Sequence, residues 1–140
     1  MLISEEYFLK KSIFESGMTT ALVLPNVTLA AIVRDEMMNP AGGIVDFIDS
    51  TVPWVAEAVI VDTGSVDGTR EALEQMQAKY PQLKVLDTVF EGYAQARNFS
   101  LQQVEKGRKV LVLDADERLT TSDFRTLNWF LEHHGRLYFY

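Results

Sequence analysis

The chain contains no cysteine among its 140 residues, which excludes disulfide bonds, thiolate zinc sites and cysteine nucleophiles. It also lacks an uninterrupted apolar stretch of about 18 residues, so we expect no transmembrane helix. Its first residues do not combine a positively charged segment with an apolar one, so we expect no signal peptide. These absences favour a cytoplasmic protein, with peripheral contact to a membrane as the alternative.

Basic residues are few, because 13 Lys and Arg stand against 20 Asp and Glu and give a net charge of -7. They are scattered, whereas surfaces that bind nucleic acid or anionic membranes need clustered Lys and Arg. We therefore expect no nucleic-acid partner. With 47% hydrophobic residues, the chain can bury one sizeable core, but it is too short for two ordinary domains.

Short apolar runs alternate with helix-like segments along the chain. The run 27–33 is nearly all apolar, which is typical of a strand covered on both faces in a parallel sheet. Comparable runs predict further strands at 58–61, 83–86 and 109–113. Helical patterns begin near these residues: Asn39 and Pro40, Ala72, Gln95 and Thr120. This order predicts an α/β fold with a mostly parallel sheet and helices on both faces.

The two ends of the chain carry weaker patterns. Residues 1–26 precede the first strand, and we expect an extension that packs on the domain, with a short helix from Ser4 to Gly17. The domain itself is predicted to span 27–140, with a last strand at 136–140 after Gly135. If that aromatic strand lies at an exposed edge, it favours a homo-oligomer through this edge.

Asp114 and Asp116 stand one residue apart, directly after the apolar run 110–113. In a strand, residues i and i+2 point to the same side, so the spacing predicts two carboxylates directed to one point beyond the sheet. Mg2+ and Mn2+ prefer oxygen ligands, and Mg2+ often completes its shell with water and substrate phosphates. We therefore predict that Asp114 and Asp116 hold Mg2+ or Mn2+, and through it a phosphate compound.

Carboxylates also follow the first two predicted strands, and parallel sheets bind their ligands at the carboxyl ends of strands. Asp35 and Glu36 follow the first strand, and Asp62 follows the second. The loop 62–69 holds two glycines, so its backbone can approach a ligand, and Asp62 is favoured as an acceptor for a base N–H or a ribose hydroxyl. Asp67 is interpreted as the N-cap of the next helix. Neither a GxGxxG nor a Walker A sequence occurs.

Three segments occur together in an order and spacing that resemble the family 2 glycosyltransferases of the GT-A fold. They are Asp-Thr-Gly-Ser-Val-Asp-Gly-Thr at 62–69, Ala-Arg-Asn at 96–98 and Leu-Asp-Ala-Asp-Glu at 113–117. Residues 31–36 are similar to the opening strand of that family. The resemblance therefore extends from about residue 27 to the end of the chain.

The resemblance implies a glycosyltransferase with a UDP-, GDP- or dTDP-linked sugar donor, a glycan, lipid or protein acceptor, and Mg2+ or Mn2+ at the Asp-x-Asp motif. Asp116 would be the principal metal ligand, with Asp114 toward the ribose or the metal. Arg97 would brace the diphosphate or an aspartate, although a surface salt bridge explains it equally well. The implied donor-binding residues are Val33, Arg34, Glu36, Asp62, Gly64, Ser65, Arg97, Asp114, Ala115 and Asp116.

The general base of the reaction is not assigned. In the family it is a later carboxylate, and none of Glu117, Asp123 and Glu132 matches it by motif. The acceptor-binding part is also not recognised in the sequence. Two alternatives follow: the chain is the donor half of a longer enzyme, or it is a module that binds the donor without transferring the sugar.

Three other interpretations compete with this one. A receiver-like signalling domain also holds Mg2+ with strand-end aspartates, but it needs a lysine at the end of a late strand, and Lys109 begins its strand. A phosphatase of the haloacid dehalogenase type would carry Asp-x-Asp on its first strand, not its fourth. The aspartates could also be turn formers and caps alone. Three acidic loops at one edge of the sheet favour a ligand site.

Overall fold

The computed structural model describes residues 24–134 and shows a four-stranded, fully parallel sheet, as predicted. Its strands are β1 (Leu24–Val33), β2 (Val55–Asp62), β3 (Leu83–Asp87) and β4 (Lys109–Val112), in the spatial order β3-β2-β1-β4. Its helices are α2 (Gly43–Thr51), the 3-10 helix η1 (Val52–Trp54), α3 (Thr69–Lys79), α4 (Tyr93–Gln102) and α5 (Thr121–His134). No helix within residues 24–134 has both the length and the apolarity that a membrane span requires. The helix predicted at 4–17 and the strand predicted at 136–140 lie outside the described residues.

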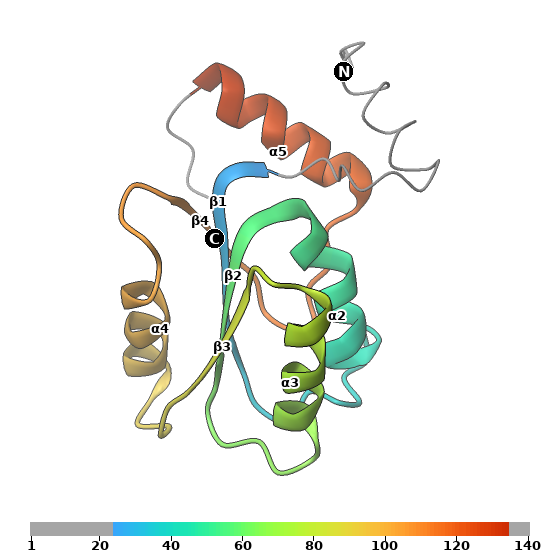
Figure 1. The fold of residues 1–140 in the computed structure, drawn as a ribbon, viewed down its shortest axis with the longest axis vertical. Helices are drawn as coiled ribbons and strands as arrows, with labels where there is room; N and C mark the ends of the chain where they lie inside the picture. Colours follow the sequence, from blue (N-terminus) through green and yellow to red (C-terminus); the bar gives the residue numbers. More distant parts are fainter. Residues whose placement is uncertain (1–23, 135–140) are drawn as a thin grey trace.

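Helices cover both faces of the sheet (Figure 1). Helix α4 lies against one face, where it contacts β1 and β2, and α2 and α3 lie together on the other. Helix α5 crosses the end of the sheet at which β1 and β2 begin. Because all strands are parallel, their carboxyl ends meet at the opposite edge, which α5 leaves uncovered.

The two central strands form the middle of the hydrophobic core. Residues 29–31 of β1 and 58–61 of β2 have no accessible surface. Burial on both faces explains why these runs are continuously apolar and do not alternate with polar residues. The register pairs Val33 with Asp62, so the ends of β1 and β2 lie side by side at the carboxyl edge.

The boundaries of β2 and α2 differ from the predictions for identifiable reasons. Strand β2 begins at Val55, three residues before the predicted start. The prediction missed these residues because Glu57 interrupts the apolar pattern. The buried Glu57 carboxylate pairs with the Lys84 ammonium at 3.3 Å. Helix α2 begins at Gly43 and not near Asn39. The Asn39 carboxamide oxygen accepts the N–H groups of Ala41 (3.0 Å) and Gly43 (2.9 Å), which forms a turn ahead of the helix.

Helix α5 is joined to the domain at its first turn. The helix predicted to begin near Thr120 is confirmed, and a capping box starts it: the Thr120 N–H donates to Asp123 Oδ2 at 2.8 Å, and the Asp123 N–H donates to Thr120 Oγ1 at 3.0 Å. One turn into the helix, the buried Phe124 ring stacks on Trp54 of η1 with centroids 5.1 Å apart and planes within 4°. The stack holds α5 at the amino ends of the strands.

Arg70 of α3 and Asp87 at the end of β3 form an ion pair with two contacts, Nε to Oδ1 at 2.7 Å and Nη2 to Oδ2 at 3.1 Å. The hydrogen bond from Arg70 holds the pKa of Asp87 below its ordinary value of 3.8. A lowered folded pKa means that the pair stabilises the fold above the unfolded pKa, and that this contribution is lost as pH falls through the folded pKa.

We expect a double-mutant cycle of Arg70→Met and Asp87→Asn to give a coupling free energy of about 0.5 to 1 kcal/mol near neutral pH, the upper range for exposed pairs. Urea unfolding of the four proteins at several pH values measures this coupling. It should shrink as pH falls below 3.8. A coupling that stays constant down to about pH 2 would show that the Asp87 charge does not contribute.

Candidate functional site

A cleft of about 470 Å³ opens at the carboxyl edge of the sheet, between the ends of β1 and β4 and the start of α4. Seven of the ten predicted donor-binding residues line it: Val33, Arg34, Glu36, Arg97, Asp114, Ala115 and Asp116. The other three, Asp62, Gly64 and Ser65, lie in the adjacent β2–α3 loop and do not line the cleft. The fold thus brings three distant segments together around one open space.

The loops after β1 and β2 are joined by hydrogen bonds. Three consecutive backbone N–H groups of the β1–α2 loop donate to side chains of the β2–α3 loop: Asp35 to Ser65 Oγ (2.9 Å), Glu36 to Thr69 Oγ1 (2.8 Å) and Met37 to Asp67 Oδ2 (3.1 Å). In return, the Val66 N–H donates to Asp35 Oδ1 at 2.7 Å. The two loops therefore form a single structure beside the cleft, and Ser65 contributes to it by supporting Asp35.

Asp67 is not the N-cap of α3, contrary to the prediction. Gly68 occupies that position with φ of 102°, a conformation that favours glycine. The Asp67 carboxylate instead lies one residue earlier and accepts the Thr69 N–H at 3.0 Å and the Thr69 hydroxyl at 2.6 Å. Burial raises the pKa of Asp67, but the hydrogen bonds from Thr69 and Met37 outweigh it and lower the pKa from its ordinary value.

The Asp62 carboxylate fixes the backbone of the loop that follows it. Its side chain is only 2% exposed, and Oδ1 accepts the N–H groups of Gly64 and Ser65, both at 2.8 Å. Its other oxygen, Oδ2, is buried and has no hydrogen-bond partner in the described part of the chain. A buried carboxylate oxygen without a hydrogen-bond partner costs free energy, and a ligand that donates a hydrogen bond to Oδ2 would remove this cost. That this acceptor receives a base N–H stays a prediction.

The Asp114–Asp116 segment is a turn and not the end of a strand. Strand β4 ends at Val112, the Glu117 N–H donates to the Asp114 carbonyl at 2.9 Å, and the Asp114 N–H donates to Glu117 Oε1 at 2.8 Å. The argument from strand alternation was therefore wrong, because the i and i+2 rule does not hold in a turn. Both aspartates are exposed, and both line the cleft.

Arg97 of α4 brings a cation to the cleft. Its Nη2 lies 3.5 Å from Asp114 Oδ1, and the two groups form an ion pair. Its Nη1 is buried and has no hydrogen-bond partner among residues 24–134. The guanidinium thus pairs with an aspartate, and binding of its free donor to a phosphate oxygen stays a prediction.

Four residues that line the cleft were not predicted: Ile32, Thr63, Phe90 and Tyr93. The last two are the most informative, because their rings pack edge to face with centroids 5.1 Å apart, and Tyr93 is 77% exposed. Exposed rings at the opening of a cleft can stack on a flat ligand. The signal in the sequence is a pair of aromatic residues, three apart, between the third predicted strand and the helix predicted from Gln95.

Residues 39–139 match the sequence profile of glycosyl transferase family 2. The matched range contains the Asp62 loop, Arg97 and the Asp114–Asp116 turn. The chain belongs to glycosyl transferase family 2. A search of curated protein sequences found no match to this family 2 chain.

Solved structures with the GT-A fold resemble the family 2 chain. TarS 1–349 from S. aureus has a TM-score of 0.63 at 24% identity, over 78% of this chain and 33% of that fragment. TarS 1–349 in complex with UDP has a TM-score of 0.61 at 22% identity, over 78% and 32%. The mannosyltransferase PcManGT from Pyrobaculum calidifontis, in complex with GDP-Man and Mn2+, has a TM-score of 0.60 at 24% identity, over 89% and 39%. The GT-A fold is thereby established, and the matched part of the chain spans 33% of TarS 1–349 and 39% of PcManGT.

The carboxylates of the family 2 chain fit a hard divalent cation. Asp114 and Asp116 supply two exposed carboxylates to one cleft. Within residues 24–134, no three His, Cys, Asp or Glu side chains lie close enough to hold a metal ion by themselves. Mg2+ is typically bound through one or two carboxylates and completes its shell with phosphate oxygens and water. The residues present therefore fit a metal that is bound together with an anionic ligand.

Proposed function

We propose that the chain is the donor-binding part of a glycosyltransferase that uses a nucleotide-diphosphate sugar and Mg2+ or Mn2+. The observation that carries the proposal is the meeting of Asp114, Asp116 and Arg97 in one cleft at the carboxyl edge of the sheet. Membership of family 2 supports it, as do the UDP and the GDP-Man with Mn2+ bound by structures of the same fold.

The proposed roles follow from charge and position. Asp116, whose carboxylate is exposed, would be the principal metal ligand, and Asp114 would share the metal while it pairs with Arg97. Arg97 would donate to the diphosphate from its unsatisfied Nη1. A bound divalent cation would stabilise the negative charge that builds on the departing diphosphate. The ends of β1 and β2 would hold the base, with the Asp62 Oδ2 as an acceptor.

A donor-binding module without turnover is the competing function. It is favoured by one observation, which concerns the general base that a transferase needs. The cleft offers three carboxylates, Glu36, Asp114 and Asp116, and two of these are assigned to the metal, so that Glu36 remains as the candidate base. Glu36 already accepts a hydrogen bond from Asn39 at 3.1 Å. Both functions require donor binding, and only the enzyme transfers or hydrolyses the sugar. An assay for sugar release from the bound donor separates them.

Thermal unfolding with UDP-, GDP- and dTDP-sugars, with and without Mn2+, tests donor binding. A ligand at about 100 times its Kd adds about 2.7 kcal/mol of apparent stability, which raises the unfolding temperature measurably. We expect one nucleotide class to stabilise the chain more strongly with Mn2+, and EDTA to remove the additional part. A folded chain whose unfolding temperature is the same with every nucleotide and metal would contradict the proposal.

A further inference from the structure

Arg118 lies outside the cleft lining but contacts the turn that carries the two aspartates. Its Nη1 donates to the Ala115 carbonyl at 2.7 Å and to the Glu117 carbonyl at 2.9 Å. These carbonyls belong to the residues directly before and after Asp116. One nitrogen therefore fixes the backbone on both sides of the proposed principal metal ligand.

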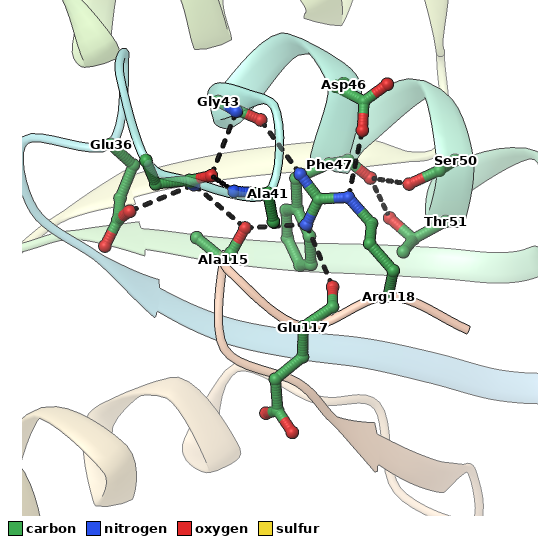
Figure 2. A network of polar contacts seen from close by, with 11 residues as sticks. Glu36, Ala41, Gly43, Asp46, Phe47, Ser50, Thr51, Ala115, Glu117 and Arg118 are labelled. Carbon is green, nitrogen blue, oxygen red and sulfur yellow. Dashed lines mark hydrogen bonds and ion pairs between the residues drawn. The ribbon is translucent and has the colours of Figure 1, made fainter.

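Helix α2 anchors the guanidinium of Arg118 (Figure 2). Its Nε donates to Asp46 Oδ2 at 3.0 Å, and its Nη2 donates to the Gly43 carbonyl at 3.2 Å. The same group lies over the Phe47 ring, 5.4 Å from the centroid, and this ring is fully buried. The Arg118 side chain is only 21% exposed. Four hydrogen bonds and a ring contact thus give the guanidinium one position between α2 and the turn.

The Ala115 carbonyl is held from a second direction. Asn39, in the loop after β1, donates to it from Nδ2 at 3.0 Å. Two donors on one carbonyl oxygen fix the plane of the peptide that joins Ala115 to Asp116, and that plane sets the direction of the Asp116 side chain. Ala115 itself is 2% exposed, so water does not compete for this carbonyl.

We propose that Arg118 is a positioning residue that aims the Asp116 carboxylate at the metal. The inference rests on the proposed function. Arg118 contacts neither the metal nor the donor; it acts through the backbone of the turn. A lysine could not replace it, because an ammonium is a point charge and lacks the planar fork that spans α2 and two carbonyls at once.

The test measures how tightly the full chain binds Mn2+ with saturating UDP or GDP, whichever binds the wild type, by electron paramagnetic resonance of free Mn2+. We expect Arg118→Met to weaken Mn2+ binding roughly 10- to 100-fold, the usual loss when a residue that orients a metal ligand is removed. Arg118→Lys keeps the charge and should lose most of the same affinity. Asp46→Asn leaves the arginine but removes its anchor, and should lose several-fold.

Arg108→Met is the matched control. Arg108 is similarly buried, at 24% exposed, and pairs with Glu105 at 3.1 Å, but it lies just before β4 at the edge opposite the cleft. Both methionine variants lose an ion pair and should lower the unfolding temperature, whereas Arg108→Met should bind Mn2+ as the wild type does.

Three results would overturn the positioning role. Folded Arg118→Met that binds Mn2+ as tightly as Arg108→Met would show that Arg118 only stabilises the fold. Full Mn2+ affinity in Arg118→Lys would show that its charge matters and its geometry does not. If Arg118→Met does not fold, unchanged Mn2+ affinity in Asp46→Asn would likewise show that Arg118 only stabilises the fold. Wild-type chain that binds no nucleotide with Mn2+ would contradict the proposed function itself.

Discussion

Asp116→Ala is expected to abolish the Mn2+-dependent part of nucleotide binding, a loss of more than about 100-fold in Mn2+ affinity, beyond what removal of a supporting residue costs. The reason is the small number of ligands. Of the three carboxylates that line the cleft in the described part of the chain, Glu36, Asp114 and Asp116, the last two are proposed to bind the metal, and Asp114 also pairs with Arg97 at 3.5 Å. Removing Asp116 leaves the metal one of its two proposed carboxylate ligands, and Arg97 shares that one.

Isothermal titration of nucleoside diphosphate with and without Mn2+ measures this effect. Asp116→Asn keeps the size of the side chain and should lose nearly as much as alanine, because the amide carries no charge. Asp49→Asn is the control, since Asp49 is a partly exposed carboxylate on α2 that pairs with Lys79 at 2.8 Å and does not line the cleft. Metal-dependent binding that survives in both Asp116 variants would place the metal elsewhere.

Phe124→Ala is expected to cost about 3 to 5 kcal/mol of unfolding free energy, the range for a buried aromatic residue replaced by alanine. Phe124 is 1% exposed and is the side chain through which α5 stacks on Trp54. The substitution leaves a cavity under α5 and removes the partner of the Trp54 ring. Because Trp54 directly precedes the start of β2 and the cleft lies at the carboxyl ends of the strands, nucleotide affinity of the folded fraction should not change.

Urea unfolding followed by circular dichroism measures the loss. Phe124→Leu retains much of the apolar volume and should cost clearly less than alanine. Val66→Ala is the surface control, because Val66 is 90% exposed and its truncation should change stability by less than about 0.5 kcal/mol. A loss below about 1 kcal/mol for Phe124→Ala would mean that α5 unfolds separately from the sheet.

Strands β1 and β2 were predictable because both are buried on both faces, which leaves continuous apolar runs in the sequence. The start of β2 was missed because a charged residue, Glu57, is buried there beside Lys84, and a tertiary ion pair leaves no local pattern. The start of α2 was placed too early because the Asn39 side chain forms a turn at residues where a helix was expected.

The candidate site was predictable in two ways: Asp114 and Asp116 follow an apolar strand, and Arg97 came from the resemblance to family 2. Their common cleft confirms the geometry that parallel strands impose, although the turn after β4 replaced the expected strand. Arg118 could not be found in this way. Its partner Asp46 lies 72 positions away in the sequence, and only the folded chain brings α2 beside the turn.

The hydrogen bonds between the loops after β1 and β2 constrain how this scaffold can be altered. Three adjacent amides of one loop depend on Ser65, Asp67 and Thr69 of the other. A loop grafted alone from a relative would leave those amides unmatched, since each needs an oxygen at its own position. Engineers who wish to change ligand preference should therefore exchange both loops as one cassette.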